Sequence, residues 1–268
     1  SIYKEAQLPF SWHKKIFDKA KKLGLICFSS VFDEKSLNFL EKLNAPMYKV
    51  ASLESLHFPL LKKICQTKKP IIISTGTLSL NEIKNLIVFL KKNKCKKFII
   101  LHCVTQYPAD YKNVNLKTIE MLRKKFKCLI GYSDHTKGIG VALSSINYGA
   151  CVIEKHFMLN SKEKTLDSNF SSDVKEMGNL AREINNSWQA IGKPKKNITK
   201  GEKIYKNYRR SIYVTKNIKR NERFTSYNLK VIRPGFGLDP KFYDMILGKS
   251  AKKNLKVGEP LKKNMVKF

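Results

Sequence analysis

Six short apolar runs recur along the first part of the chain, and each predicts a strand. They span residues 26–30, 47–52, 70–75, 98–103, 129–133 and 151–154. Each run is short, continuous and rich in β-forming residues, which is typical of strands buried on both faces of a sheet. The stretches between the runs, such as 80–92 and 116–126, carry apolar residues at helical spacing. Strands that alternate with helices predict parallel βα units.

The six predicted units favour a TIM-type (β/α)8 barrel, because polar side chains recur where each predicted strand ends. Such a barrel needs eight strands. The chain starts without an initiator methionine and close to a predicted helix. We therefore expect an N-terminally truncated barrel that lacks two units. The alternative is an open doubly wound sheet, which is less favoured because no glycine-rich phosphate-binding sequence follows the first strand.

A different pattern begins after a long predicted helix at 174–191. Residues 193–207 are rich in lysine and turn formers and predict a linker. Residues 208–268 predict a small β-rich domain, with strands at 211–215 and 230–233 and a capped helical turn at 224–229. The expected domains are therefore a partial barrel over 1–192, the linker and the small domain.

Apolar content and cysteine usage limit the class of protein. The chain is 42% hydrophobic, but no run approaches the roughly 20 apolar residues of a membrane span. Residues 1–6 have no features of a signal peptide. None of the six cysteines forms a CxxC pair, and four of them (27, 103, 128 and 151) fall in predicted strands. We expect buried, reduced thiols and a cytoplasmic protein without a membrane partner.

The formal charge of +32 suggests a nucleic-acid partner at first sight. However, only seven of the 53 basic residues are arginine, and the lysines are spread along the whole chain. Arginine is the residue that reads phosphate and guanine edges in a bidentate way. We therefore expect solvated lysine-rich surfaces and no nucleic-acid partner. The positive field would still attract a small anionic substrate.

Two histidines are the first candidates for chemistry. His135 and His156 each lie where a predicted strand ends, and they are 21 residues apart, about one βα repeat. Consecutive strand ends of a parallel barrel lie side by side on the face where active sites form. The two imidazoles could therefore bind one divalent metal ion. The alternative is two unrelated histidines, one of them buried in the core, and the spacing alone does not decide between these interpretations.

Other polar residues at the predicted strand ends support a site. The candidates are Lys49, Ser52, Glu54, Ser74, Thr75, Thr105, Tyr107, Ser133 and Asp134. Lysine, hydroxyls and backbone N–H groups suit a phosphorylated acid, and a metal ion can act as a Lewis acid on a carbonyl. Each residue alone has a structural explanation; Glu54, for example, could cap a helix. Together they predict an anion site beside a metal ion.

Five motifs resemble those of the sialic acid synthase family in order and spacing. They are Lys49-Val50-Ala51-Ser52-Leu53-Glu54, Ser74-Thr75-Gly76, His102-Cys103 with Tyr107-Pro108, Gly131-Tyr132-Ser133-Asp134-His135-Thr136, and Glu154-Lys155-His156-Phe157. The tail, with Arg209-Arg210-Ser211, Arg233-Pro234-Gly235 and Leu247-Gly248-Lys249, resembles the antifreeze-like (SAF) domain of that family. The resemblance covers essentially the whole chain. It implies a transferase that condenses phosphoenolpyruvate with an N-acetylated amino-sugar.

Within the family, Leu166-Asp167-Ser168-Asn169-Phe170-Ser171 and the stretch 233–241 are similar to the branch that makes pseudaminic acid. That branch joins phosphoenolpyruvate to 2,4-diacetamido-2,4,6-trideoxy-L-altrose, releases phosphate and serves bacterial surface-glycan biosynthesis. The alternatives are the siblings that make N-acetylneuraminic or legionaminic acid. A non-catalytic basic binding protein and an inactive fragment remain as interpretations from other classes.

The resemblance also implies a role for each matching residue. His135 and His156 would bind Mn²⁺ or Mg²⁺. Glu54, Tyr107 and Asp167 would lie near the reacting sugar, as catalytic residues. The residues that would hold phosphoenolpyruvate are Lys49, Ser52, Ser74, Thr105 and Ser133. Arg233 would reach the acetamido group of the sugar from the small domain of a second subunit, which implies a domain-swapped homodimer.

Overall fold

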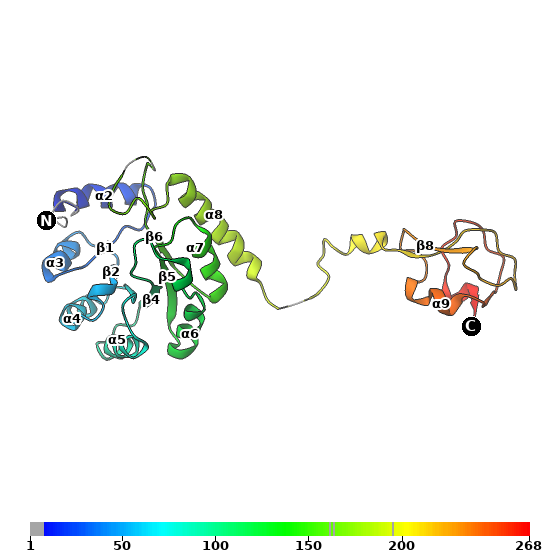
Figure 1. Ribbon diagram of the computed structural model, residues 1–268, viewed down its shortest axis with the longest axis horizontal. Helices are drawn as coiled ribbons and strands as arrows, with labels where there is room; N and C mark the ends of the chain where they lie inside the picture. Colours follow the sequence, from blue (N-terminus) through cyan, green and yellow to red (C-terminus); the bar gives the residue numbers. More distant parts are fainter. Residues whose placement is uncertain (1–7, 161, 163, 195) are drawn as a thin grey trace. The chain divides into compact units, whose positions relative to one another are not determined.

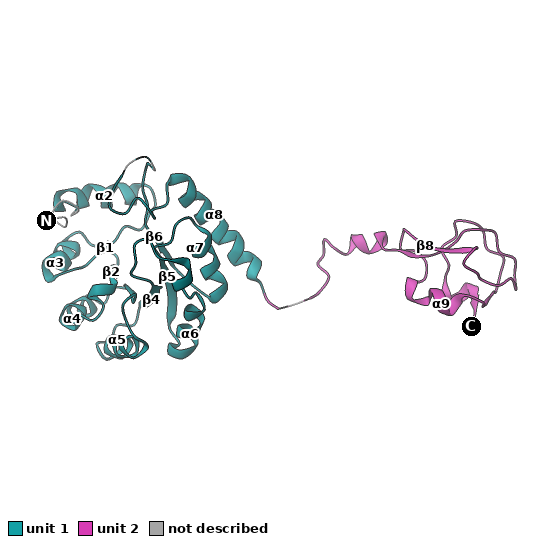
Figure 2. Ribbon diagram, in the orientation of Figure 1, with its two compact units in different colours: residues 1–192 teal, residues 193–268 magenta. Residues whose placement is uncertain are grey.

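The computed structural model describes residues 8–160, 162, 164–194 and 196–268, which fall into two compact units (Figure 2). Unit 1 comprises residues 1–192 and unit 2 comprises residues 193–268. Residues 1–6, from which we inferred the missing units and the lack of a signal peptide, lie outside the described residues.

Unit 1 contains one parallel sheet, and its helices form an outer arc around the strands (Figure 1). The strands are β1 (Ser29–Ser30), β2 (Tyr48–Val50), β3 (Ile71–Ser74), β4 (Phe98–Cys103), β5 (Leu129–Asp134) and β6 (Ile153–Lys155). The helices are α2 (Phe10–Lys22), α3 (Glu34–Lys42), α4 (Phe58–Gln66), α5 (Leu80–Lys92), α6 (Lys117–Phe126), α7 (Gly140–Ser145) and α8 (Val174–Ile191). Short 3-10 turns are η1 (Ser52–Glu54), η2 (Tyr111–Asn113) and η3 (Ile146–Tyr148).

The order of the strands decides between the two predicted architectures. The sheet runs β1-β2-β3-β4-β5-β6, so each strand pairs with its neighbours in sequence. A doubly wound sheet reverses its strand order at a switch point, and this sheet has no reversal among the described strands. The doubly wound alternative is therefore wrong, and the sheet has the arrangement of a TIM-type barrel. Closure by eight strands stays a prediction.

The observed bounds of helices and strands agree best with the predicted ones where the sequence signals are strongest. The helices α5 and α8 and the strand β4 have the predicted bounds. The capping box of Ser79 and Glu82 fixes the start of α5, because each side chain accepts a hydrogen bond from a backbone N–H of the other residue. The prediction of a strand over 26–30 is wrong in length. The register pairs Ser29 with Tyr48, the first residue of β2, so the residues before Ser29 have no strand partner.

The prediction of buried cysteines is confirmed for Cys65, Cys95 and Cys103 and is wrong for the other three. All six thiols are free, and Cys103 is the one cysteine that lies within a described strand. Cys27 and Cys128 lie just before strands and are half-buried. Cys151 is exposed, because it lies in the turn between η3 and β6 rather than in the strand.

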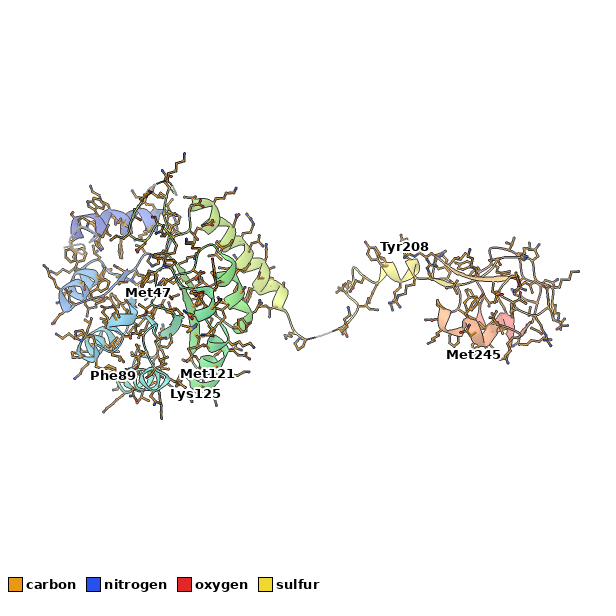
Figure 3. All side chains as sticks on the ribbon, viewed as in Figure 1. Met47, Phe89, Met121, Lys125, Tyr208 and Met245 are labelled. Carbon is orange, nitrogen blue, oxygen red and sulfur yellow. The ribbon has the colours of Figure 1, made fainter. Side chains whose placement is uncertain are left out.

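The core of unit 1 lies between the sheet and the helical layer. Leu61 and Ile64 of α4 and Leu86 and Leu90 of α5 are fully buried against the strands. Each such side chain contributes about 1.5–3 kcal/mol of transfer free energy. The ring centroids of Phe58 and Phe89 lie 4.6 Å apart and tie α4 to α5. Figure 3 shows Phe89 on α5 in the outer layer and Met47, just before β2, on the inner side of the helices.

The pH dependence of stability should depend on His102 of β4. Burial lowers the pKa of this imidazole below its ordinary 6.5, and Nε2 lies 2.7 Å from the carbonyl oxygen of Val114. The unfolded chain then binds a proton more readily, so His102 subtracts stability as the pH falls below about 6.5. Replacing His102 with glutamine, which keeps a donor, should flatten that loss. Urea unfolding of both proteins between pH 5 and 7.5 measures this pH dependence. If the free energy of unfolding falls equally with pH in the parent and in His102→Gln, the prediction is wrong.

Unit 2 has its own apolar core and two short antiparallel sheets. Its elements are η4 (Ile204–Tyr208), β7 (Ser211–Val214), β8 (Leu229–Ile232), η5 (Pro240–Phe242), α9 (Tyr243–Ile246), β9 (Ser250–Ala251), η6 (Lys263–Met265) and β10 (Val266–Lys267). The strands pair as β7 with β8 and β9 with β10 around Ile212, Phe224 and Leu261. The predicted helical turn at 224–229 is a single turn, in which Asn228 and Leu229 donate to the Thr225 carbonyl. The segment predicted as a linker ends in η4.

None of the helices in the part of the chain that the structure describes is long and apolar enough to cross a membrane.

Candidate active site

A cavity of about 370 Å³ opens at the C-terminal ends of the strands of unit 1. Each of the six adjacent strands contributes at least one residue to its wall. These include Ser30, Lys49, Ser74, Cys103, Ser133 and Glu154, in the order of β1 to β6. Ala51, Ser52, Tyr107, His135, Lys155 and His156 complete the lining. Parallel strands bring residues far apart in sequence to one rim, which explains how the predicted candidates meet.

Lys49 is the central cation of the cavity. The side chain is 9% exposed, and Nζ donates to Ser74 Oγ at 2.8 Å and to the Val50 carbonyl at 3.0 Å. Glu154 Oε1 lies 3.6 Å from Nζ and also accepts from Ser133 Oγ at 2.8 Å. Burial lowers the pKa of Lys49, and the charge of Glu154 opposes that shift. The arrangement presents hydroxyls and an ammonium group side by side, which suits an anionic ligand.

Ser52, Gly76 and Thr105 pack tightly beside Lys49. The Gly76 amide donates to Ser52 Oγ at 3.0 Å. Thr105 Oγ1 is buried and has no hydrogen-bond partner among the described residues. A Cβ at Gly76 would overlap Thr105 Oγ1 and lie 3.0 Å from Ser52 Oγ. The chain therefore needs glycine at this position so that the three segments can approach.

We expect Gly76→Ala to destabilise unit 1, because the added methyl group must push Thr105 or Ser52 away. Overpacking of this kind costs about 1–3 kcal/mol of unfolding free energy. Gly178→Ala is the matched control, since Gly178 lies in α8 and a methyl group added there would meet no neighbouring atom within 4 Å. That change should instead stabilise the helix by about 1 kcal/mol. Urea unfolding measures both, and equal free energies for Gly76→Ala and the parent would contradict the expectation.

The two histidines face each other across the cavity. Their ring centroids lie 5.4 Å apart and their planes meet at 65°. His135 Nδ1 lies 2.8 Å from the Val104 carbonyl oxygen, and His156 Nδ1 lies 3.4 Å from Asp167 Oδ2. An Nδ1–H that donates to oxygen leaves the lone pair on Nε2 free, which is the state of a metal-binding imidazole.

The donor set therefore fits a divalent metal ion. Two imidazoles with oxygen-rich neighbours suit a transition metal such as Mn²⁺, while Mg²⁺ would depend more on the oxygen ligands. No group of three or more histidine, cysteine, aspartate or glutamate side chains with metal-site geometry occurs among the described residues. Among the described residues, His135 and His156 are the side chains that would bind such an ion.

Cys103 forms the floor of the cavity beside His135. Its Sγ lies 3.8 Å from His135 Nδ1 and accepts from Ser52 Oγ at 3.8 Å. Burial alone would raise the pKa of the thiol, but the interaction with His135 and the hydrogen bonds of Ser52 and Ser133 together lower the pKa below its ordinary 9.0. The thiol is therefore polarised toward the cavity.

An aromatic wall covers the histidines on one side. The ring of Tyr107 lies 4.4 Å from that of His135, and the ring of Phe170 lies 4.8 Å from that of His156. Burial first, and then the charges of Cys103 and Asp167, raise the pKa of Tyr107. Phe170 is 2% exposed and also packs on Tyr107, at 5.5 Å between centroids. The wall keeps the two imidazoles oriented.

Phe170 and Asp167 belong to a loop that leaves β6 and returns to the same place. Ser172 N donates to the His156 carbonyl at 2.8 Å, and Met158 N donates to the Ser172 carbonyl at 2.9 Å. These two bonds close the loop at its base. Asp167 reaches back to His156 although its own side chain is 52% exposed.

Not all predicted site residues meet at the cavity. Lys49, Ser52, Ser74, Tyr107, Ser133, His135 and His156 line it together. Asp167 touches the site through His156, whereas Glu54 in η1 and Thr105 after β4 lie outside the lining. Arg233 follows β8 in unit 2, where its side chain is exposed, and its role stays a prediction.

Six residues of the site were given no role from the sequence. They are Ser30, Ala51, Cys103, Glu154, Lys155 and Phe170. Glu154 could have been found, because a carboxylate within a continuous apolar strand needs a partner or a function. Phe170 carries no such signal, since an aromatic residue in a loop is ordinarily assigned to the core.

The sequence pattern of the NeuB family matches residues 1–196, and that of the SAF domain matches residues 209–267. The chain belongs to the NeuB family. The resemblance to sialic acid synthases is thereby confirmed, as is the SAF domain at the C-terminal end.

Curated relatives of this NeuB family chain include two different synthases. Pseudaminic acid synthase of Campylobacter jejuni subsp. jejuni serotype O:2 is 38% identical over 263 residues, which is 97% of this chain and 76% of the relative. N,N'-diacetyllegionaminic acid synthase of the same organism is 38% identical over 261 residues, 96% of this chain and 78% of the relative.

A solved structure of the family superposes on the chain. The crystal structure of N-acetylneuraminic acid (sialic acid) synthetase from Leptospira borgpetersenii serovar Hardjo-bovis in complex with citrate gives a TM-score of 0.71 at 31% identity. The match covers 75% of this chain and 70% of that one. The parallel sheet and its helices therefore have the fold of a sialic acid synthase.

Proposed function

We propose that this protein condenses phosphoenolpyruvate with an N-acetylated amino-sugar and releases phosphate, and that its product is pseudaminic acid. One observation carries the proposal: a buried lysine with its serine partners lies beside two converging imidazoles at one strand-end cavity. An anion site next to a metal site is what an enolpyruvate donor and an aldehyde acceptor require. The related pseudaminic acid synthases support the same activity.

Lys49, Ser52, Ser74 and Ser133 would bind the phosphate and carboxylate of phosphoenolpyruvate, and Thr105 would contribute its unpartnered hydroxyl. The Lys49 ammonium is held in place by Ser74, so little ordering is needed when the anion binds. Bound in this way, the enol carbon C3 of phosphoenolpyruvate faces the acceptor sugar.

His135 and His156 would hold Mn²⁺ or Mg²⁺. A bound metal ion supplies Lewis-acid polarisation of the sugar aldehyde. The Val104 carbonyl, 2.8 Å from His135 Nδ1, would hold the Nδ1 proton of that imidazole, and Asp167 Oδ2 lies 3.4 Å from His156 Nδ1. After C3 attacks the aldehyde carbon, water adds at C2 and phosphate leaves by C–O cleavage. Glu154 lies within 3.6 Å of Lys49 Nζ, where it can hold a proton for these steps.

Tyr107, Asp167 and Glu54 would surround the sugar, and Arg233 of a second copy of this chain would bind the acetamido group in a domain-swapped homodimer. The overall similarity does not choose the sugar, because the pseudaminic and legionaminic acid synthases of C. jejuni are both 38% identical to this chain. Residues 167–171, which contact the site through Asp167 and Phe170, favour the pseudaminic precursor.

The free thiols support a cytoplasmic location.

Phosphate release tests the proposal. The protein is incubated with phosphoenolpyruvate, Mn²⁺ and either 2,4-diacetamido-2,4,6-trideoxy-L-altrose or N-acetylmannosamine. We expect release with the altrose sugar alone. Release with N-acetylmannosamine alone would overturn the pseudaminic assignment and favour the N-acetylneuraminic alternative. No release with either sugar or with the acceptor sugar of legionaminic acid synthesis, from protein that binds Mn²⁺, would overturn the synthase activity of this chain.

A further inference from the structure

A fully buried ion pair lies directly behind the two histidines. Lys155 Nζ lies 2.8 Å from Asp134 Oδ2, and the two side chains are 1% and 0% exposed. Asp134 and Lys155 are register partners on β5 and β6. The next residue on each strand is a histidine of the site, so the pair joins the two strands at the last position before the imidazoles.

The pair is embedded in a network that satisfies both charges. Asp134 Oδ1 accepts from the Tyr132 hydroxyl at 3.0 Å and from the Thr136 amide and hydroxyl at 2.9 and 2.8 Å. Lys155 Nζ donates a second bond to the Thr136 carbonyl at 2.8 Å. Every described partner belongs to β5, β6 or the residue that follows His135. The network therefore ties the two strand ends to each other.

Strand alternation separates Asp134 and Tyr132 from the substrate-facing residues, whereas Lys155 also belongs to the cavity lining. Ser133 and Glu154 are the preceding register partners, and their side chains join on the cavity side. Asp134 and Tyr132 point the opposite way, and Tyr132 belongs to the core under the helices. His135 again faces the cavity. The ion pair thus acts on the imidazoles through the backbone.

We propose that Asp134 and Lys155 are positioning residues that set the spacing of His135 and His156 and thereby the affinity for the metal ion. The inference rests on the proposed function only through the metal site, and not through the identity of the sugar. A buried pair costs desolvation that an apolar pair would avoid, so its presence here calls for a benefit other than stability. A fixed distance between two ligands is such a benefit, because it removes reorganisation on binding.

The chain offers a matched control. Lys69 and Glu41 form a second pair, at 2.5 Å, that also shares a tyrosine, Tyr48. This pair lies away from the histidines, and Lys69 precedes β3 at the opposite end of the strand from the cavity. Lys69→Met should therefore perturb stability without touching the spacing of the imidazoles.

The test is a Mn²⁺ titration of the full chain, followed by the electron paramagnetic resonance signal of free Mn²⁺. We expect Lys155→Met and the double variant Asp134→Asn/Lys155→Met to raise the Kd about tenfold. Lys69→Met should leave the Kd within about twofold of the parent. Urea midpoints, measured in parallel, separate loss of affinity from loss of folding.

Three results would overturn the inference: a Lys155→Met protein whose Kd is that of the parent, an equal loss in all variants including Lys69→Met, or a folded parent that does not bind Mn²⁺. If Lys155→Met does not fold, Tyr132→Phe carries the test, because it removes one hydrogen bond to Asp134 and keeps the ring. It should raise the Kd about threefold, and an unchanged Kd would be decisive against the inference.

The proposed function and this inference can fail separately. A parent that binds Mn²⁺ more tightly than Lys155→Met but releases no phosphate with either sugar refutes the synthase and leaves the positioning role intact. Conversely, if the parent releases phosphate and the Lys155→Met variants bind Mn²⁺ with the Kd of the parent, only the positioning role is refuted.

Discussion

Replacing His135 with alanine is expected to lower the rate of phosphate release from phosphoenolpyruvate at least about a thousandfold. His135 is 5% exposed, its Nδ1 is fixed by the Val104 carbonyl, and its ring faces that of His156. Without it a metal ion keeps a single imidazole ligand. The stabilisation of negative charge on the aldehyde oxygen, worth several kcal/mol, is then lost. Phosphate release at saturating phosphoenolpyruvate, sugar and Mn²⁺ measures the effect.

His13→Ala is the control for this variant, since it also removes one imidazole. His13 lies in α2, where its ring packs on Phe39 and takes no part in the cavity. The rate of phosphate release by His13→Ala should stay within about twofold of that of the parent. A His135→Ala protein that binds Mn²⁺ and turns over like the parent would refute the role of His135.

Lys49→Met is expected to reduce kcat/KM for phosphoenolpyruvate about 100- to 1000-fold, mainly through a higher KM. Methionine keeps most of the length of the lysine stem but removes the ammonium that Ser74 orients. Lys155 also lines the cavity, but its charge is engaged by Asp134, so it does not replace Lys49. Initial rates over a series of phosphoenolpyruvate concentrations provide the measurement.

The Kd for Mn²⁺ should not change in Lys49→Met, because Lys49 does not touch either histidine. Lys63→Met serves as the control: Lys63 pairs with Glu34 on the outer helices, and its side chain is 44% exposed. A parent-like KM for phosphoenolpyruvate in Lys49→Met would contradict the placement of the anion site. A raised KM in Lys63→Met would show that net charge, and not the site, attracts the substrate.

The sequence predicted most of the fold of unit 1, because its signals there are local. The run that becomes β4 opens with four consecutive apolar residues, and Ser79 with Glu82 fixes the start of α5 without help from distant residues. The prediction failed at β1, whose length depends on where β2 begins. The length of a paired strand depends on both segments, so it cannot be predicted from the sequence of one segment alone.

The residues of the site also fall into those that local sequence signals predict and those that depend on how strands pair. The rule that strand ends meet was enough to bring together Lys49, Ser74, Ser133 and the two histidines. It did not assign Glu154, whose part in the site comes from its register with Ser133. It also placed Glu54 and Thr105 on the rim, but neither residue belongs to the cavity lining. Residue type and spacing identify the rim, and the backbone decides which side chains face inward.

The loop that carries Asp167 and Phe170 is closed at its base by the bonds between His156, Met158 and Ser172. Insertions or deletions inside this loop leave its base, and hence the end of β6, unchanged. A single-residue insertion within β5 or β6 has the opposite effect, because it would exchange the two faces of the strand and carry a histidine out of the cavity. Diverging lineages can therefore change the length and composition of the loop beside the cavity, while the strand ends tolerate substitution but no change in length.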